Sequence, residues 1–228
     1  MSGMTFLVPL AKHTAFRSIS LANRPIGTVR LRRAVAQTVA HGELLRIAVG
    51  VGNAKYPGWI NTDINWPARN YLDLMKPWPT PPVDRIFADN VIEHFTIRNG
   101  RVVLANVLAA LRPGGGIRIA TPDAERTARA YLDNTEIGQR HLERHRRYGY
   151  EVHYPVDLLR VTFAEAEHYL GFIYDYASLS AELDRAGFVR VMRREAGESD
   201  DPAFCNLERR LGETEAATSL IAEAWKAD

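Results

Sequence analysis

The chain has 228 residues and a single cysteine, Cys205, with no pair of cysteines spaced to hold a metal. An internal disulfide is therefore excluded, and so is a zinc site built on cysteine pairs. A lone thiol in a chain of this length is typical of a protein kept in a reducing compartment. We therefore expect a cytoplasmic protein.

Long apolar runs are also missing. No stretch approaches the roughly 20 apolar residues that a membrane-spanning helix needs, so the sequence predicts no membrane span. The segment MSGMTFLVPLAKHTAFRS has a short apolar run, but no charged region precedes it and no small-residue cleavage site follows it. It is a poor secretory signal.

Neither sign of charge is in large excess. The net charge is +2, which is too balanced to indicate a nucleic-acid partner by itself. Arginines cluster in GTVRLRRAV near the N-terminus and in RHLERHRRYGY in the middle of the chain. Such clusters are typical of solvated helix faces, and a groove for nucleic acid is the alternative interpretation.

The sequence does contain an alternation of apolar strands with helical patterns. We predict strands in LLRIAVG, WINTDI, DRIFADN and GIRIATPD, and a short one in NYLDLM. In NGRVVLANVLAALRPGGG the apolar residues, including Leu111, recur at helical spacing before a proline and three glycines. This alternation predicts an α/β fold with a mainly parallel sheet.

The chain divides into three parts by composition. Residues 1–42 form a basic N-terminal arm, and residues 43–226 form the main domain. Within that domain, residues 124–176 are rich in His, Arg and Tyr and carry helical patches such as AERTARAYL, so we predict a helical cap over the strand ends. After the cap we expect a helix in YASLSAELDRAGF and strands in FVRVMRREA and TSLIAEAWKAD.

The stretch LRIAVGVGNAKYPGWINTDI carries the first candidate site. Gly50 and Gly52 follow the first strand, and only six residues separate Gly52 from Trp59. A crossover helix does not fit there, which weakens the case for the pyrophosphate of NAD or FAD, and no GK[ST] marks a P-loop.

S-adenosylmethionine has a ribose but no phosphate and needs no such helix. Asp63 stands where an acid accepts from both ribose hydroxyls, and Asp73 where one accepts from the adenine amino group.

Four segments, IAVGVGNAKYPGWINTDI, YLDLMKPWP, DRIFADNVIEHF and LAALRPGGGIRIATPD, resemble in this order the motifs of class I S-adenosylmethionine-dependent methyltransferases. The resemblance is to a bacterial branch with a PGW-x-N-x-D second strand that often accompanies glycan biosynthesis. It implies a Rossmann-like sheet of seven strands, the last antiparallel. It also implies that Gly50 and Gly52 face the methionine part of the cofactor, Asp63 the ribose and Asp73 the adenine, with Asn90 beside the cofactor.

Methyl transfer from a sulfonium is an in-line displacement, and a hydroxyl acceptor also needs a base or a metal to remove its proton. The candidate bases are Asp123 after the fifth strand, His94 after the fourth and His153 in the cap; a structural role is the alternative for each. Asp89, Glu93 and Asp123 form a carboxylate set for Mg²⁺. No spacing rule supports that set, so the metal stays unknown.

The acceptor is predicted from the cap. Its tyrosines, Tyr148, Tyr150, Tyr154 and Tyr169, suit a saccharide, an oligosaccharide or another hydroxylated small molecule, or they simply pack the cap. We expect O-methylation of such a molecule. Nucleic-acid methylation is a weaker alternative because no NPPY-type motif follows the fourth strand. A methyltransferase-like binding or regulatory module without turnover, possible as a homodimer through the N-terminal arm, is the non-enzyme alternative.

Overall fold

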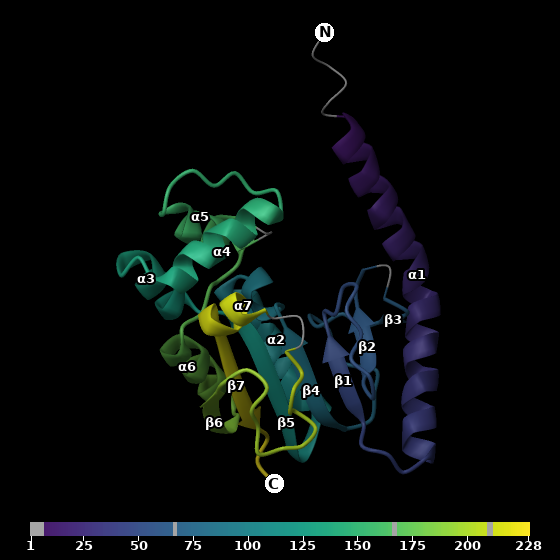
Figure 1. Cartoon of the computed structure of the whole chain (residues 1–228). Coiled ribbons are helices and arrows are strands. Elements are labelled where there is room, and N and C mark those ends of the chain that lie inside the picture. The colour runs from purple at the N-terminus through teal and green to yellow at the C-terminus, as the bar shows by residue number, and fades with distance from the viewer. Residues whose placement is uncertain (1–6, 66–67, 166–167, 209–211) are drawn as a thin grey trace.

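The computed structural model describes residues 7–65, 68–165, 168–208 and 212–228 (Figure 1). Its seven strands form one sheet in the order β3-β2-β1-β4-β5-β7-β6. The strands are β1 (Arg46–Val49), β2 (Ile60–Asp63), β3 (Asn70–Tyr71), β4 (Val83–Asp89), β5 (Leu111–Pro122), β6 (Val189–Arg194) and β7 (Ser219–Trp225). Neighbours among β1 to β5 are parallel, whereas β7 is antiparallel to both β5 and β6. The predicted α/β sheet with an antiparallel last strand is confirmed.

Helices connect the strands and form the cap. They are α1 (Leu7–Ala40), α2 (Ile97–Ala110), α3 (Ala124–Leu132), α4 (Glu136–Arg147), α5 (Asp157–Ala164), α6 (Tyr176–Ala186) and α7 (Glu213–Thr218), with 3₁₀ turns η1 (Ile92–His94) and η2 (His168–Leu170). None of the helices described is long and apolar enough to span a membrane. Leu111, predicted as a helical residue, instead begins β5, where it pairs with Val83.

One face of the sheet is covered by helices. Alternate strand residues such as Ile47, Ile86 and Ile117 pack there against apolar side chains of α1, α2 and α6. The start of α6 is fixed by Asp175, whose side chain accepts from the backbone of Ser178, and its end by Gly187 at φ 101°. The helix predicted in YASLSAELDRAGF is therefore confirmed.

The other face of the sheet has a different cover. The connection from β1 to β2, residues 50–59, consists of turns and contains no helix, as its length predicted. Aromatic side chains form the small core on this face: Tyr56, Trp59, Phe87, Phe204 and Trp225. Beside them the wholly buried Arg118 pairs with the buried Glu208 and Glu223. This face is closed by loops and by a buried ion network.

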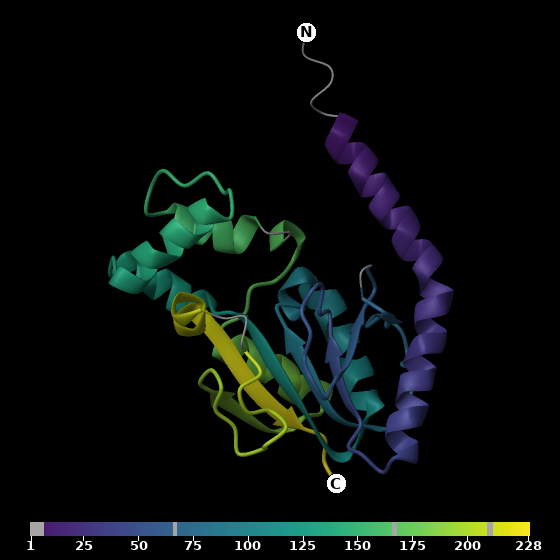
Figure 2. The ribbon, with the colours of Figure 1, turned by 45° about the vertical axis from the view of Figure 1, so that its right-hand side comes forward.

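The cap lies over the edge of the sheet at which the parallel strands end (Figures 1 and 2). It consists of α3, α4 and α5, which pack around a small apolar core made of Ala130, Leu142, Val152, Leu158 and Val161. α1 runs beside β3 and β2 on the opposite side of the sheet, and its N-terminal half extends past the sheet (Figure 2). The cap and α1 thus flank the strand ends.

Candidate functional site

The turn after β1 has a backbone that only glycine adopts readily. Gly50 has φ 59° and Gly52 has φ 53°. A Cβ added to Gly50 would lie 2.5 Å from Cγ2 of Val91, whereas one added to Gly52 would meet no atom within 4 Å. The backbone N–H of Gly52 donates to Oδ2 of Asp63 at 2.9 Å. The glycine turn and the end of β2 are therefore held together, with open space above Gly52.

A first cavity of about 510 Å³ lies at the ends of β1, β2 and β4, and its size suits a small-molecule ligand. All five residues predicted to bind the cofactor line it, and so does the candidate base His94. The lining residues are Gly50, Gly52, Asp63, Ile64, Asn65, Leu72, Asp73, Leu74, Met75, Asn90, Val91, His94 and Phe95. Parallel strands end at the same edge, which is why these separate segments meet.

Two carboxylates in this cavity are held by backbone amides. Oδ1 of Asp63 accepts from the N–H of Asn65 at 2.8 Å. Oδ1 of Asp73 accepts from the N–H of Met75 at 3.1 Å, and its Oδ2 lies 3.2 Å from Nζ of Lys76. A carboxylate oxygen has more than one lone pair, so both groups retain acceptor capacity for a ligand.

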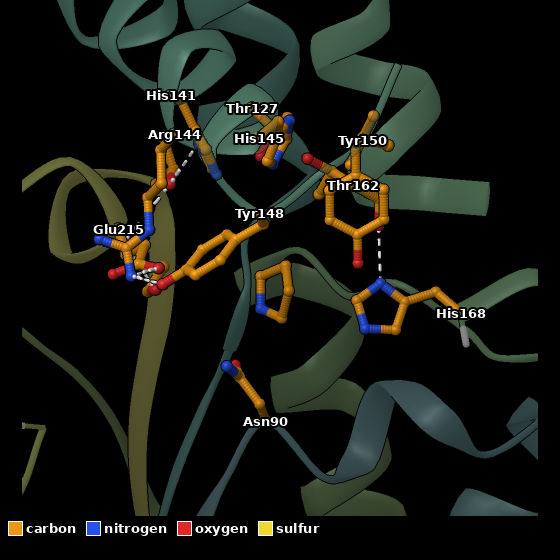
Figure 3. Close-up of a pocket in the computed structure, with 14 residues that line it drawn as sticks. Asn90, Thr127, His141, Arg144, His145, Tyr148, Tyr150, Thr162, His168 and Glu215 are labelled. Carbon is orange, nitrogen blue, oxygen red and sulfur yellow. Dashed lines mark hydrogen bonds and ion pairs between the residues drawn. The ribbon is translucent and has the colours of Figure 1, made fainter. Parts of the chain in front are cut away.

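A second cavity, of about 210 Å³, lies between the sheet and the cap (Figure 3). Asn90 lines it as well as the first cavity, so the two meet at this residue. The other lining residues come from the cap, the end of β5 and the segment around α7: Pro122, Thr127, His141, Arg144, His145, Tyr148, Tyr150, Val161, Thr162, His168, Glu215, Thr218 and Ser219.

Two buried histidines of α4 face this cavity. Burial, aided by the charge of Arg144, lowers the pKa of His141 to about 3 and that of His145 to about 4. Their rings lie 4.4 Å apart between centroids, and Nδ1 of His141 is 3.2 Å from Oγ1 of Thr218. Both imidazoles are therefore neutral at neutral pH.

Several polar atoms around the cavity have no hydrogen-bond partner among the described residues. They are Oγ1 of Thr127, Oγ1 of Thr162, Nε of Arg144 and Nδ1 of His145. Buried polar atoms are normally hydrogen-bonded, so a group of such atoms around one cavity indicates a polar ligand or ordered water. Thr127, His145 and Thr162 are among the lining residues labelled in Figure 3.

The charged groups of this cavity compensate each other. Arg144 forms an ion pair with Glu215, and its Nη2 also donates to the hydroxyl of Tyr148 at 2.6 Å (Figure 3). With His141 and His145 neutral and Arg144 paired, these three residues add no excess charge of either sign. Of the four cap tyrosines, Tyr148 and Tyr150 line it, whereas Tyr154 and Tyr169 are exposed outside it.

The candidate bases lie in three different surroundings. His94 lines the first cavity. Asp123 is fully buried, caps α3 through the N–H groups of Glu125 and Arg126, and pairs with Arg193 at 2.6 Å. It lines neither cavity, so its expected position in the pocket is corrected: its carboxylate is committed to a helix start. His153 is exposed in the α4–α5 loop and also lines neither cavity.

The carboxylate set expected for Mg²⁺ is not assembled. Tyr56 donates to Oδ2 of Asp89 at 2.7 Å, Thr121 donates to Oε2 of Glu93 at 3.0 Å, and Asp123 is held as described. In the described parts of the chain, a different group brings possible ligand atoms within 4.8 Å of one another: Glu93, His94 and His168.

Tyr148, Tyr150 and Asn90 of the second cavity were predicted from the sequence, but its histidines and threonines were not. His141, His145 and His168 were not singled out. The spacing of four between His141 and His145 places both on one face of a helix, and this signal was present in RHLERHRR. For Thr127 and Thr162 the sequence carries no comparable signal, because the two helices that bring them together are set by tertiary packing.

The sequence matches no protein-family model and no curated protein. Solved structures align with most or all of this chain but with only part of their own length. Human N-acetylserotonin methyltransferase in complex with SAM shares 16% identity over 81% of this chain and 48% of that chain, with a TM-score of 0.48. The CurJ carbon methyltransferase shares 15% over 81% and 49%, with a TM-score of 0.48. The apo form of SibL, an S-adenosylmethionine-dependent methyltransferase, shares 16% over 100% and 60%, with a TM-score of 0.48.

The chain spans about half the length of the first two of these structures. Similarity to solved structures at this identity and TM-score does not indicate the activity of this chain. The function of the chain is therefore inferred from its own residues.

Proposed function

We propose that this chain binds S-adenosylmethionine in the first cavity and methylates a hydroxyl of an uncharged small molecule, preferably a saccharide, held in the second. One observation carries the proposal. A single cavity at the strand ends contains Gly50, Gly52, Asp63, Asp73 and Asn90, the residues that the methyltransferase resemblance assigns to the cofactor.

The first cavity fits this cofactor through its own chemistry. Asp63 and Asp73 supply fixed acceptors for ribose hydroxyls and for an amino group, and the aliphatic Leu74 and Met75 lie beside them for a ring. The turn after Gly52 leads into no helix, so the helix N-terminus that a dinucleotide's pyrophosphate uses is missing from residues 50–59. When bound, S-adenosylmethionine supplies a methyl group activated by a positively charged sulfur.

The second cavity favours an uncharged, hydroxylated acceptor. Neutral histidines, threonine hydroxyls and the compensated Arg144–Glu215 pair offer hydrogen bonds without net charge. The rings of Tyr148 and Tyr150 add the aromatic surface that sugars use. Because Asn90 lines both cavities, a bound acceptor would reach the cofactor there.

Nucleic acid is a weaker acceptor because many arginines of the cap are already paired. Arg126 pairs with Glu195, and the pairs Arg129–Glu125 and Arg140–Glu136 lie one turn apart on their helices. A nucleic-acid groove needs several cations available to phosphates. The cap therefore offers little of the positive surface that its composition suggested.

Calorimetric titration tests the cofactor. We expect wild-type protein to bind S-adenosylmethionine but not NAD, and Asp63→Ala to weaken binding at least about tenfold, because hydrogen bonds to a charged group are lost. The matched control is Asp133→Ala, which removes an exposed carboxylate outside the cavity. Wild-type protein that binds NAD, or neither ligand, would overturn the proposal.

The acceptor is tested on the same protein with a panel of glycosides, and methylated product is measured by mass spectrometry. Methylation of a sugar hydroxyl is the expected result. Cofactor binding without methylation of any hydroxylated molecule would instead favour a regulatory module.

A further inference from the structure

We propose that Glu93, His94 and His168 bind a divalent transition-metal ion at the boundary between the two cavities. Each residue offers one ligand atom, and these atoms lie within 4.8 Å of one another. His94 lines the first cavity and His168 lines the second, so an ion held here would face both.

The fold brings the two turns that carry these residues into close contact. Glu93 and His94 lie in η1 after β4, and His168 lies in η2 after α5. The N–H of Phe172 donates to the carbonyl of Glu93 at 3.1 Å. A Cβ on Gly171 would lie 1.7 Å from that carbonyl oxygen, so only glycine permits this approach. The cluster therefore depends on a specific backbone arrangement of η1 and η2.

Glu93 has the properties of a carboxylate that lacks a cation. Its side chain is fully buried, and Oε2 accepts from Thr121. Its Oε1 has no hydrogen-bond partner among the described residues and lies 4.0 Å from Nε2 of His168. A buried carboxylate is costly unless it is paired, and a metal ion would supply the partner.

His168 is oriented as metal-binding histidines usually are. Its Nδ1 lies 2.7 Å from the carbonyl oxygen of Thr162. A carbonyl only accepts hydrogen bonds, so Nδ1 carries the proton, and the lone pair of the neutral ring is on Nε2, the atom nearest to Glu93. A backbone carbonyl that fixes the tautomer in this way is a common outer partner of metal ligands.

His94 completes the group on its open side. Its side chain is exposed, and its ring centroid lies 4.9 Å from that of His168. Two imidazoles and one carboxylate suit Zn²⁺ and related ions better than Mg²⁺, which prefers oxygen ligands throughout. Three protein ligands leave a coordination position for water or substrate, as in catalytic zinc sites.

Metal binding does not depend on the proposed function. If that function holds, the open position lies where an acceptor hydroxyl meets the cofactor cavity, and the ion would ease the loss of the hydroxyl proton to solvent.

The test uses the full chain without an affinity tag, treated with EDTA and desalted. Zn²⁺ is titrated by calorimetry and Co²⁺ by visible absorption. We expect one equivalent to bind to wild type, and the affinity to fall at least about tenfold in His94→Ala and in Glu93→Gln. The control His41→Ala removes an exposed histidine outside the cluster and should bind as wild type does.

Two results would overturn the assignment: no saturable binding by wild type, or equal affinity in wild type and both cluster variants. Because His94 is exposed, its replacement leaves the fold intact, and circular dichroism verifies this. Titration with S-adenosylmethionine on the same samples separates a failure of the metal site from a failure of the proposed function.

Discussion

The two cavities are built in different ways. The first uses one continuous part of the chain, residues 50–95, and backbone amides hold its carboxylates and close its turn. The second gathers side chains from α3, α4, α5, η2 and the α7–β7 segment. The first cavity is therefore fixed by backbone conformation and the second by side-chain identity. Under the proposed function, a change of acceptor would therefore require only substitutions in the second cavity.

The largest expected effect concerns the backbone of the first cavity. Gly50→Ala places a side chain at φ 59° and 2.5 Å from Val91, whereas Gly42→Ala at φ 68° meets no atom within 4 Å. The left-handed backbone costs about 1–2 kcal/mol in both variants, and the clash adds about 1–3 kcal/mol at Gly50. Urea unfolding should therefore show a clearly larger loss for Gly50→Ala. Equal losses would mean that Val91 moves away and that the turn is not constrained by packing.

The next effect concerns the side chains of the second cavity. His145→Phe removes a buried imidazole whose Nδ1 has no partner among the described residues, so we expect stability to change by less than about 1 kcal/mol. Cofactor affinity should stay as in wild type, and methylation of the acceptor should fall at least about tenfold because its alignment is lost. A parallel fall in cofactor affinity would show that the two cavities are not independent.

The third effect is a pH dependence specific to the second cavity. Folding lowers the pKa of His141 and His145 from 6.5 to about 3 and about 4, so below pH 6.5 the unfolded chain binds protons that the folded chain does not. These residues should therefore lower the free energy of unfolding as the pH falls from 6.5 toward 4, and contribute nothing above 6.5.

Urea unfolding at pH 7.5 and pH 5 measures this dependence. The decrease on acidification should be smaller in His145→Phe than in wild type and unchanged in the exposed His41→Ala. An identical decrease in His145→Phe and wild type would mean that His145 is not desolvated.

Much of the first cavity was predictable because its signals are local. A strand followed by Gly50 and Gly52, a short connection and Asp63 at the next strand end are all visible within twenty residues, and parallel pairing brings such ends together. The sequence failed where the partner of a residue is distant. Asp123 looked like a pocket acid, but Arg193 of β6 and the first turn of α3 use its carboxylate.

The sequence by itself determined most of the strands, the glycine turn without a crossover helix and the acid Asp63 at the next strand end, because these follow from short-range patterns and from parallel pairing. The methyltransferase resemblance added Asn90 to this set. Only the tertiary structure decided that His141 and His145 are buried and neutral, and that His168 lies beside Glu93. The neutrality of the two histidines depends on their desolvation. The contact between Glu93 and His168 joins two turns that are 75 residues apart in the sequence. No local pattern encodes them.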